Sequence, residues 1–486
     1  MSNFLKTNLP VYFIFLFACI FILLQSPLAP FAKSIPGIDS SVFIYTAQQI
    51  LDGQMIYKDI VDHKGPFLYL INVIALFCFN GKWIGIWIFE IFSMFVACIM
   101  MYKTARMFAG KFVSVLAVIT SILMIVPVLI GGNLTEEWAL PYISIAMYIF
   151  LSYLKENKSL TTWRLFILSF TFVLTLMLRA NLIAVWGGFG IALLIKWIVE
   201  KQYKEFIRCL SLMLFFVIIS IVPFFLYFYL KGTLSDALYL VFQFNLFEYA
   251  LISENSLTGM FKMSLLTFCN GISYFNFIPN LVIVYMFFTK KDQYAGVISA
   301  FILTIISCRL GQQHEHYFMI FIPLFVIPLA YLYNILKQCF WKKVFLWLCI
   351  TFIFYNSANI YSQYANIRAN HLKDEVYGLL TYSQMDTLTD IIWKNTKATD
   401  KILVKTNQSA IYLYSHRTSA TRFPYAITNS SSLALKYYVK DIEETLPKMI
   451  IEANQWDEYD IQPILDAKYQ PIQTDLKNIN VWLLKE

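Results

Sequence analysis

The segment 37–66, which follows the first apolar stretch of the chain, is dense in ionisable side chains. Those with a possible chemical role are Asp39, Asp59, Asp62, His63 and Lys64. A carboxylate can take a proton from a hydroxyl group, and an ammonium group can stabilise an anionic leaving group such as phosphate. The segment is therefore either a solvated loop at a membrane boundary or the floor of an active site, and the concentration of charge favours the active site.

Asp39 stands at the start of a helical pattern that Gly53 ends. One hypothesis makes it the helix N-cap, because an aspartate side chain accepts hydrogen bonds from the free amides of the first turn. The other makes it a base that faces the aqueous side. The two roles are compatible at this stage. His63, Lys64, Gly65 and Pro66 then lead directly into an apolar stretch, where Lys64 could also extend toward lipid phosphate.

A second acidic site is predicted in a short turn further along the chain. Glu136 and Glu137 are adjacent between two apolar spans. Neighbouring carboxylates repel each other unless a cation or a hydrogen-bond donor is near. They are either two solvated acids in a short loop or part of the same site as Asp39.

Three groups that are cationic or can become so are expected near the same surface, namely Arg179, Arg309 and His316. His316 and His314 flank Glu315, a pattern that suggests metal ligands. Residues two apart on a helix point to different faces, however, which argues against a metal there. The sequence therefore assigns no metal ligand and requires no cofactor, although it leaves a divalent cation open.

The composition places these residues in a membrane protein. Of 486 residues, 59% are hydrophobic and only 14% are charged, with a mean hydropathy of +0.61. These values exclude an ordinary soluble protein. The net charge of +8 does not indicate a nucleic-acid partner, because the basic residues lie mostly between apolar spans. The eight cysteines lie in or beside apolar spans and form no disulfide framework.

Apolar runs predict eleven spans within a transmembrane domain of residues 1–361. They lie near 11–29, 84–102, 112–131, 138–154, 164–180, 182–198, 207–230, 274–289, 294–309, 317–336 and 343–361. The apolar segment 67–79 would be roughly 20 Å long as a helix, against a hydrocarbon core of roughly 30 Å. It either crosses the membrane or lies in its interface.

The distribution of basic residues favours the interfacial placement. With a cytoplasmic N-terminus and no crossing at 67–79, the inner loops hold roughly twice as many Lys and Arg residues as the short outer segments. Residues 30–83 then form the first outer loop, and the C-terminus lies outside. Residues 362–486 are soluble in character. The segments 401–406, 446–453 and 479–484 are predicted strands, and 410–414 a short helix, of a small extracytoplasmic α/β domain.

The order of these elements resembles the GT-C membrane glycosyltransferases, in particular bacterial relatives of the protein O-mannosyltransferases and of the lipid A aminoarabinose transferase. The resemblance rests on Asp39 early in the first outer loop, the turn from His63 to Pro66 with the apolar helix after it, and the acidic turn at Glu136 and Glu137. It covers roughly residues 1–360. This chain departs from the family in lacking the second proline of the turn and in having His63 before the lysine.

The resemblance implies an enzyme that transfers a sugar from a polyprenyl-phosphate donor to a hydroxyl group of a glycan, lipid or protein. Asp39 would be the catalytic base, with Glu136 or Glu137 as a second catalytic acid position. The donor phosphate would be bound by Lys64, assisted by Arg179, Arg309 and His316, and supported by Asp59, Asp62 and His63. A phosphate ester leaves readily, so a single base suffices for an inverting displacement.

Two other classes compete with this interpretation. A secondary transporter would place ionisable groups near the bilayer midplane, often within inverted repeats. Glu90, inside the second span, favours transport, but the other charges cluster at one surface and no repeat is present. A polysaccharide polymerase or ligase is the nearer alternative, although its large outer loop would be expected between late spans.

Overall fold

The structure is a computed structural model. It describes residues 2–32, 34–126, 129, 132–156, 158–249, 282–283, 285–286, 292–309, 315–338, 380–406, 408–424, 432–453, 461–476 and 479–485. The predicted spans near 274–289 and 343–361, and the predicted domain boundary at 361, lie largely or wholly outside these residues.

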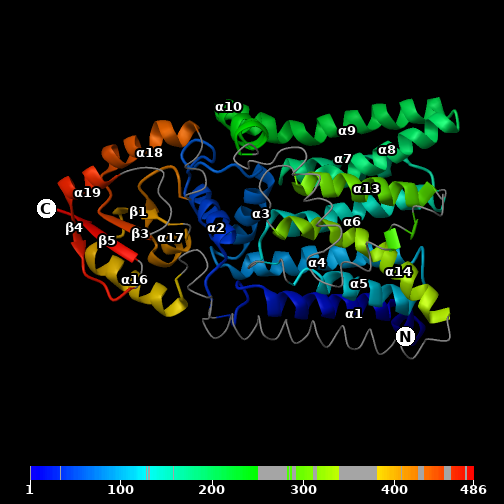
Figure 1. Cartoon of the computed structure of the whole chain (residues 1–486), viewed down its shortest axis with the longest axis horizontal. Coiled ribbons are helices and arrows are strands. Elements are labelled where there is room, and N and C mark those ends of the chain that lie inside the picture. The colour runs from blue at the N-terminus through cyan, green and yellow to red at the C-terminus, as the bar shows by residue number, and fades with distance from the viewer. Residues whose placement is uncertain are drawn as a thin grey trace.

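Long apolar helices run side by side through most of the molecule (Figure 1). They are α1 (Ser2–Gln25), α4 (Ile84–Ala105), α5 (Lys111–Leu123), α6 (Thr135–Leu154), α7 (Thr162–Leu176), α8 (Ala184–Val199), α9 (Tyr203–Leu230), α13 (Asp292–Arg309) and α14 (Ile322–Gln338). Within the described residues, 6 helices are long and apolar enough to cross a membrane, while α5, α7 and α13 are shorter. Each predicted span in the described ranges coincides with one of these helices.

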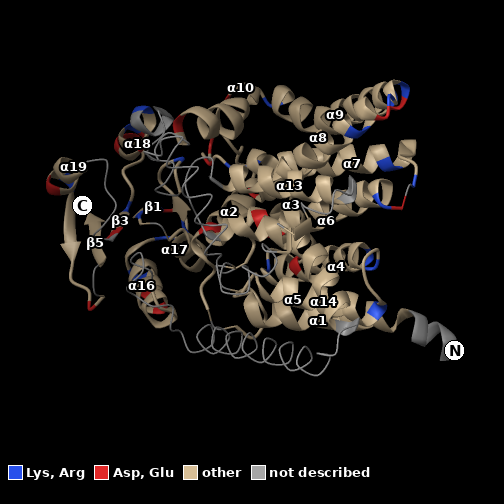
Figure 2. Ribbon diagram, turned by 45° about the vertical axis from the view of Figure 1, so that its right-hand side comes forward, with Lys and Arg blue, Asp and Glu red and all other residues tan. Residues whose placement is uncertain are grey.

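The two ends of the helix bundle differ in charge. Lys and Arg residues gather at the end farthest from the C-terminal domain, while acidic residues lie inside the bundle near its other end (Figure 2). Lys155 at the basic end lies 4.7 Å from the ring of Phe108. This asymmetry is the one that the loop charges predict. The structure contains no membrane, so which end faces the cytoplasm stays a prediction.

Two short helices cover the less basic end of the bundle, namely α2 (Ile38–Leu51) and α3 (Pro66–Cys78). The N-terminal end of α3 meets the C-terminal end of α7, where Gly65 N donates to Leu178 O at 3.0 Å. Its middle meets the residue before α6, through Asn72 and Asn133. Its C-terminal end meets the start of α4, where the carbonyl of Ala75 approaches Gly85. All three partners flank long helices at the same end, so α3 lies across that end. That it lies in the membrane interface stays a prediction.

Four shorter helical segments complete this end, namely η1 (Ala180–Ile183), α10 (Leu234–Leu238), η2 (Tyr239–Glu248) and η4 (Glu315–Phe321). The start of α2 corrects one prediction. Its N-cap is Gly37, without a side-chain hydrogen bond, and Asp39 lies inside the first turn. Asp39 is therefore not the N-cap, although a carboxylate in a first turn still interacts favourably with the helix dipole. The helix ends at Leu51, and Gly53 follows at φ +93°, as predicted.

The C-terminal domain is a five-stranded sheet in the order β2-β1-β3-β5-β4. The strands are β1 (Lys401–Lys405), β2 (Thr418–Ser419), β3 (Met449–Ala453), β4 (Tyr469–Ile472) and β5 (Ile479–Leu484). Strand β1 is parallel to β2 and β3, whereas β5 is antiparallel to β3 and β4. Around the sheet lie α16 (Tyr382–Asn395), α17 (Ala410–Ser415), α18 (Ser432–Thr445) and α19 (Gln462–Lys468).

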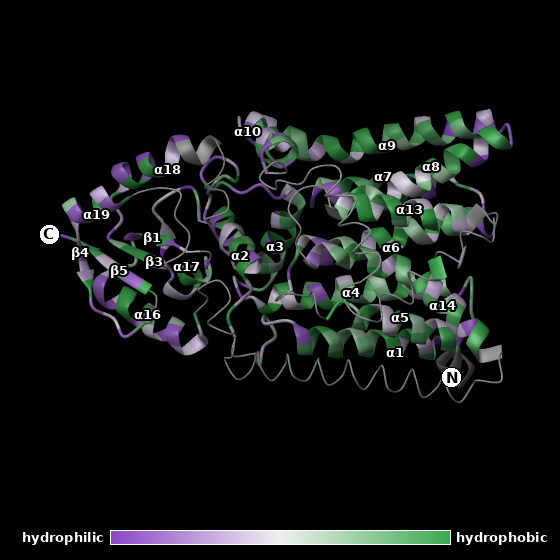
Figure 3. Ribbon diagram, in the orientation of Figure 1, coloured by the Kyte–Doolittle hydropathy of each residue, from purple (hydrophilic) through white to green (hydrophobic). Residues whose placement is uncertain are grey.

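This domain is more hydrophilic outside than the helix bundle, with apolar residues concentrated in its central strands (Figure 3). Strands β1, β3 and β5 and helix α17 confirm the predicted α/β domain. Strands β2 and β4 were not predicted. Strand β2 is only two residues long, and β4 contains Pro471, which is tolerated because β4 forms an edge of the sheet.

Candidate active site

The turn that carries Lys64 is buried rather than solvated. Asp62, His63 and Lys64 are 1%, 1% and 8% exposed. Asp62 accepts hydrogen bonds from Tyr69 OH at 2.6 Å and from the His63 backbone amide at 2.5 Å. The Lys64 ammonium lies 2.9 Å from His63 Nε2. Buried charged groups at this end of the helix bundle need hydrogen-bond or ionic partners, because burying an unpaired charge costs free energy.

His63 is held as a neutral ring between its two neighbours. Burial lowers the pKa of His63 well below its usual value of 6.5, and the positive charges of Lys64 and Arg179 lower it further. The Lys64 ammonium can only donate, so Nε2 accepts and the ring proton is assigned to Nδ1. Nδ1 lies 3.5 Å from Asp62 Oδ1. That contact does not meet hydrogen-bond geometry, and Nδ1 has no hydrogen-bond partner among the described residues. The contact with Nε2 is the one that orients the Lys64 ammonium.

The backbone of this turn is fastened to the break between α7 and η1. Gly65 N donates to Leu178 O at 3.0 Å, and Phe67 N donates to Met177 O at 3.0 Å. A Cβ atom on Gly65 would lie 2.0 Å from Met177 O. Only glycine fits so close an approach, which gives a physical reason for Gly65 before Pro66 in place of the two prolines of the family turn.

Two further side chains hold the turn from other elements. Tyr57 OH donates to the carbonyl of Lys64 at 2.8 Å, and Asn245 Nδ2 donates to the carbonyl of His63 at 2.8 Å. The sequence analysis did not single out either residue for the site. Asn245 lies in η2 and is distant in sequence, so no local pattern could have revealed this contact.

Arg179 lies beside the same break and is paired with a predicted catalytic acid. Its Nη1 donates to Glu136 Oε1 at 3.1 Å, its Nη2 donates to Tyr317 OH, and its guanidinium lies 4.1 Å from the centre of the Tyr317 ring. Glu136 also accepts from Thr135 Oγ1 at 2.8 Å. Glu136 is 1% exposed and fully engaged, so it positions Arg179 more readily than it could take a proton from a substrate.

Glu137 has a different environment from Glu136. It is 2% exposed, and neither of its oxygens has a hydrogen-bond partner among the described residues. A methyl group on Gly132 would lie 2.7 Å from Glu90 Oε1 and 3.7 Å from Glu137 Oε2, so both carboxylates border the same glycine. Glu90 accepts from Ser26 Oγ at 2.7 Å and from Asn133 N at 2.8 Å. The hypothesis of two solvated acids at 136 and 137 is therefore wrong.

Asn133 connects the acidic turn to both short helices. Its side chain donates to Ser40 Oγ at 3.2 Å, exchanges hydrogen bonds with Asn72 at 2.9 and 3.2 Å, and accepts from Trp138 Nε1 at 2.9 Å. Its φ of +55° is one that asparagine tolerates better than most residues. The sequence places Asn133 in the acidic outer turn, where an asparagine after two glycines is a recognisable turn signal, but its role as a link between the helices was not predicted.

Asp39 is half-buried in the first turn of α2, next to the Ser40 that binds Asn133. Tyr69 donates to Asp62 and packs edge-on against Phe43 of α2, with ring centres 6.2 Å apart. Contacts through Tyr69 and Asn133 therefore connect α2, the Lys64 turn and the acidic turn. That Asp39 itself belongs to the same site stays a prediction.

Some predicted site residues do not join this cluster. Asp59 is exposed, and its carboxylate accepts a hydrogen bond from the backbone amide of Met55 at 2.8 Å. It stabilises its own turn and, among the described residues, forms no hydrogen bond with the Lys64 turn, so the supporting role predicted for it does not agree with its position. His316 is half-buried and packs edge-on against Tyr317, with ring centres 4.8 Å apart. The side chains of Arg309 and Glu315, and all of His314, lie outside the described residues. In the part of the chain that is described, no three potential metal ligands gather.

A small apolar pocket borders the turn. It lies where the start of α3 meets the C-terminal part of α9, α10 and η2. Its lining consists of Pro66, Met177, Phe224, Phe225, Phe228, Leu234, Ala237, Leu238, Val241 and Phe242. An apolar surface thus begins at Pro66, two residues after Lys64, at the end of the helix bundle that holds the buried charges.

Comparison with solved structures finds this fold elsewhere. ArnT from Cupriavidus metallidurans in the apo state matches with a TM-score of 0.63 and 12% identity, covering 99% of this chain and 98% of that one. Its structure bound to undecaprenyl phosphate matches with a TM-score of 0.61 and 11% identity, covering 98% and 97%. The Archaeoglobus fulgidus oligosaccharyltransferase in complex with Zn and sulfate matches with a TM-score of 0.56 and 13% identity, covering 94% and 71%.

No protein-family model and no curated protein sequence matches the chain. ArnT and the oligosaccharyltransferase are both GT-C glycosyltransferases, and the match to ArnT spans nearly the full length of both chains. The resemblance predicted from the first outer loop and the acidic turn is confirmed at the level of the fold: this chain shares the fold of ArnT and of the oligosaccharyltransferase.

Proposed function

We propose that this protein is an integral-membrane glycosyltransferase that moves a sugar from a polyprenyl-phosphate donor to a hydroxyl group of a glycan, lipid or protein on the outer face of the membrane. The observation that carries the proposal is the buried Lys64 turn. A lysine ammonium is held there by a neutral histidine, and an apolar surface formed by α9, α10 and η2 begins at Pro66, two residues further along the chain. That combination suits a ligand with an anionic head and a long apolar tail.

The fold supports the same ligand class. One of the structures that this chain resembles was solved with undecaprenyl phosphate, and another related structure with dolichol-phosphate. In this proposal the Lys64 ammonium contacts the donor phosphate and offsets its charge as the bond to the sugar breaks. Arg179 adds positive potential nearby, and Glu136 holds its guanidinium in place.

Asp39 is the proposed base. It takes the proton of the acceptor hydroxyl while the acceptor oxygen attacks the anomeric carbon, and the donor phosphate leaves from the opposite side. This single displacement inverts the anomeric configuration and needs one base and no protonated acid. Glu137, buried and without a described partner, is the next candidate for the base. The proposed chemistry requires no cofactor.

A transfer assay with synthetic polyprenyl-phosphate sugars tests the proposal. We expect Asp39→Asn to lower turnover by roughly 10²–10⁴-fold, because general-base catalysis is worth about that much. Thermal stability should change little, since Asp39 does not cap its helix. Asp59→Asn, in the same loop but exposed, is the matched control and should retain activity. Full activity in Asp39→Asn would remove Asp39 as the base.

Transport is less well supported by the described structure. Glu90, the residue that favoured it, is bound by Ser26 and by the backbone of Asn133 near one end of the bundle. Glu90 links the segment after α1 to the turn before α6 through these hydrogen bonds. This structural role explains the buried carboxylate without an ion pathway.

A further inference from the structure

The C-terminal domain is hydrogen-bonded to the first outer loop before and after Asp39 in the sequence. Tyr414 OH donates to Ser34 O at 3.2 Å. The backbone amide of Ser419 donates to Tyr45 OH at 2.8 Å. The partners Ser34 and Tyr45 stand on either side of Asp39 in the chain, so these two contacts bracket the proposed base.

A third contact reaches the turn that holds Lys64. The backbone amide of Val61 donates to the carbonyl of Arg422 at 2.7 Å. Val61 directly precedes Asp62, whose carboxylate accepts hydrogen bonds from the His63 backbone amide and from Tyr69 OH. The carbonyl of Arg422 thus fixes the position of the backbone just before the Lys64 turn.

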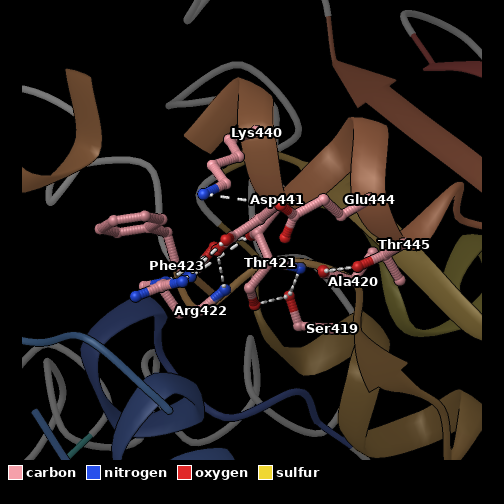
Figure 4. Close-up of polar contacts among 9 residues, drawn as sticks. All are labelled: Ser419, Ala420, Thr421, Arg422, Phe423, Lys440, Asp441, Glu444 and Thr445. Carbon is pink, nitrogen blue, oxygen red and sulfur yellow. Dashed lines mark hydrogen bonds and ion pairs between the residues drawn. The ribbon is translucent and has the colours of Figure 1, made fainter. Parts of the chain in front are cut away.

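Arg422 is itself held by one carboxylate in α18 (Figure 4). Asp441 Oδ2 accepts from the Arg422 backbone amide at 3.1 Å and from its Nε at 2.9 Å, while Oδ1 accepts from Nη2 at 2.9 Å. Asp441 is 8% exposed. The guanidinium also stacks 4.3 Å from the centre of the Tyr437 ring. A bidentate pair with an added backbone bond fixes the main chain as well as the side chain.

The segment between these contacts is braced further. Thr445 Oγ1, also in α18, donates to Ala420 O at 3.0 Å, and Ser419 Oγ donates to Thr421 O at 2.7 Å (Figure 4). The segment 419–422 is therefore held by α18 on one side and presents backbone groups to the first outer loop on the other.

We propose that Asp441 and Arg422 are positioning residues for the Lys64 turn, so that the C-terminal domain sets the geometry of the donor-phosphate site. The inference rests on the proposed function for its catalytic consequence. Its structural part, the link from Asp441 through Arg422 to Val61, does not depend on which ligand the site binds.

Hydrogen exchange on the full-length protein tests the structural part. We expect Asp441→Ala to speed amide exchange in the peptide that contains Val61 by about threefold to tenfold, because a partly exposed charge-assisted pair is lost. Asp441→Asn, which keeps one oxygen acceptor, should recover part of the protection. Glu444→Ala removes the exposed pair with Lys440 in the same helix and should leave that peptide unchanged.

Binding of undecaprenyl phosphate by the same variants tests the consequence. Asp441→Ala should weaken binding by about threefold to tenfold while exchange in β1 and β3 stays at the wild-type level. Unchanged exchange at Val61, or weaker binding accompanied by faster exchange throughout the sheet, would overturn the inference. A wild-type protein that neither binds undecaprenyl phosphate nor transfers sugar would instead refute the proposed function, and the exchange result would still decide whether the link exists.

Discussion

Lys64 is the residue on which the proposed donor site depends most. We expect Lys64→Ala to weaken donor binding by about 10- to 100-fold, since a buried charge-assisted contact contributes roughly 1.5–3 kcal/mol. Turnover should fall with it, because the same contact stabilises the departing phosphate. Lys58→Ala, in an exposed position of the same loop, is the control. Wild-type donor affinity in Lys64→Ala would take this lysine out of the site.

His63 makes the stability of the protein sensitive to acid. Its folded-state pKa is lowered well below 6.5, so below that pH the unfolded chain binds a proton that the folded chain does not. The free energy of unfolding should therefore fall as pH drops from about 7 to 5, by at most about 1.4 kcal/mol per pH unit. Melting temperatures of the wild type and His63→Asn across this range check it. A slope that survives in the variant would have to come from another group.

The sequence identified most residue types of the site but few of their partners. Lys64, His63 and Asp62 stand together in the chain, so their grouping was predictable. Glu136 and Arg179 are 43 residues apart and were assigned separate roles, whereas the structure pairs them. Asp59 was misassigned because an aspartate that binds its own turn looks the same in sequence as one aimed into a site.

At the scale of the elements, the turn before α3 packs against the break between α7 and η1 through backbone hydrogen bonds. We expect Gly65→Ala to lower the free energy of unfolding by about 1–3 kcal/mol, because the added methyl group would overlap Met177 O. Donor binding should weaken as well if the turn is displaced. Gly190→Ala, where no atom lies within 4 Å of an added Cβ, is the control. Equal melting temperatures for the two variants would contradict the close approach.

Helices were predictable from the sequence where apolar runs are long, and strands where short apolar runs such as 402–404 and 449–451 stand among polar residues. The position of α3 across the end of the bundle was inferred from charge in the loops, not from its own residues, which suit a short span equally well. Strand β2 gave no signal because two residues cannot show a period. Tertiary packing decided both cases.

For the whole molecule, the distribution of charge predicts the orientation in the membrane. We expect a reporter fused at Lys111 to be cytoplasmic and one fused at the C-terminus to be extracytoplasmic. Lys111 begins α5 shortly after α4 ends, at the end of the bundle opposite α3. Labelling of Lys111 from outside would mean that the segment 67–79 crosses the membrane and that every later loop is inverted.

The contacts between the first outer loop and the C-terminal domain also determine when, during synthesis of the chain, the loop can reach its final structure. Ser34 and Tyr45 meet partners that lie 380 and 374 residues further along the chain. At a synthesis rate of about 5–20 residues per second, those partners emerge from the ribosome roughly 20–80 s later. During that interval the loop lacks the surface on which it docks, so the Lys64 turn is among the last parts of the molecule to be completed. Truncation within the final quarter of the chain would leave the helices inserted and the turn unfinished.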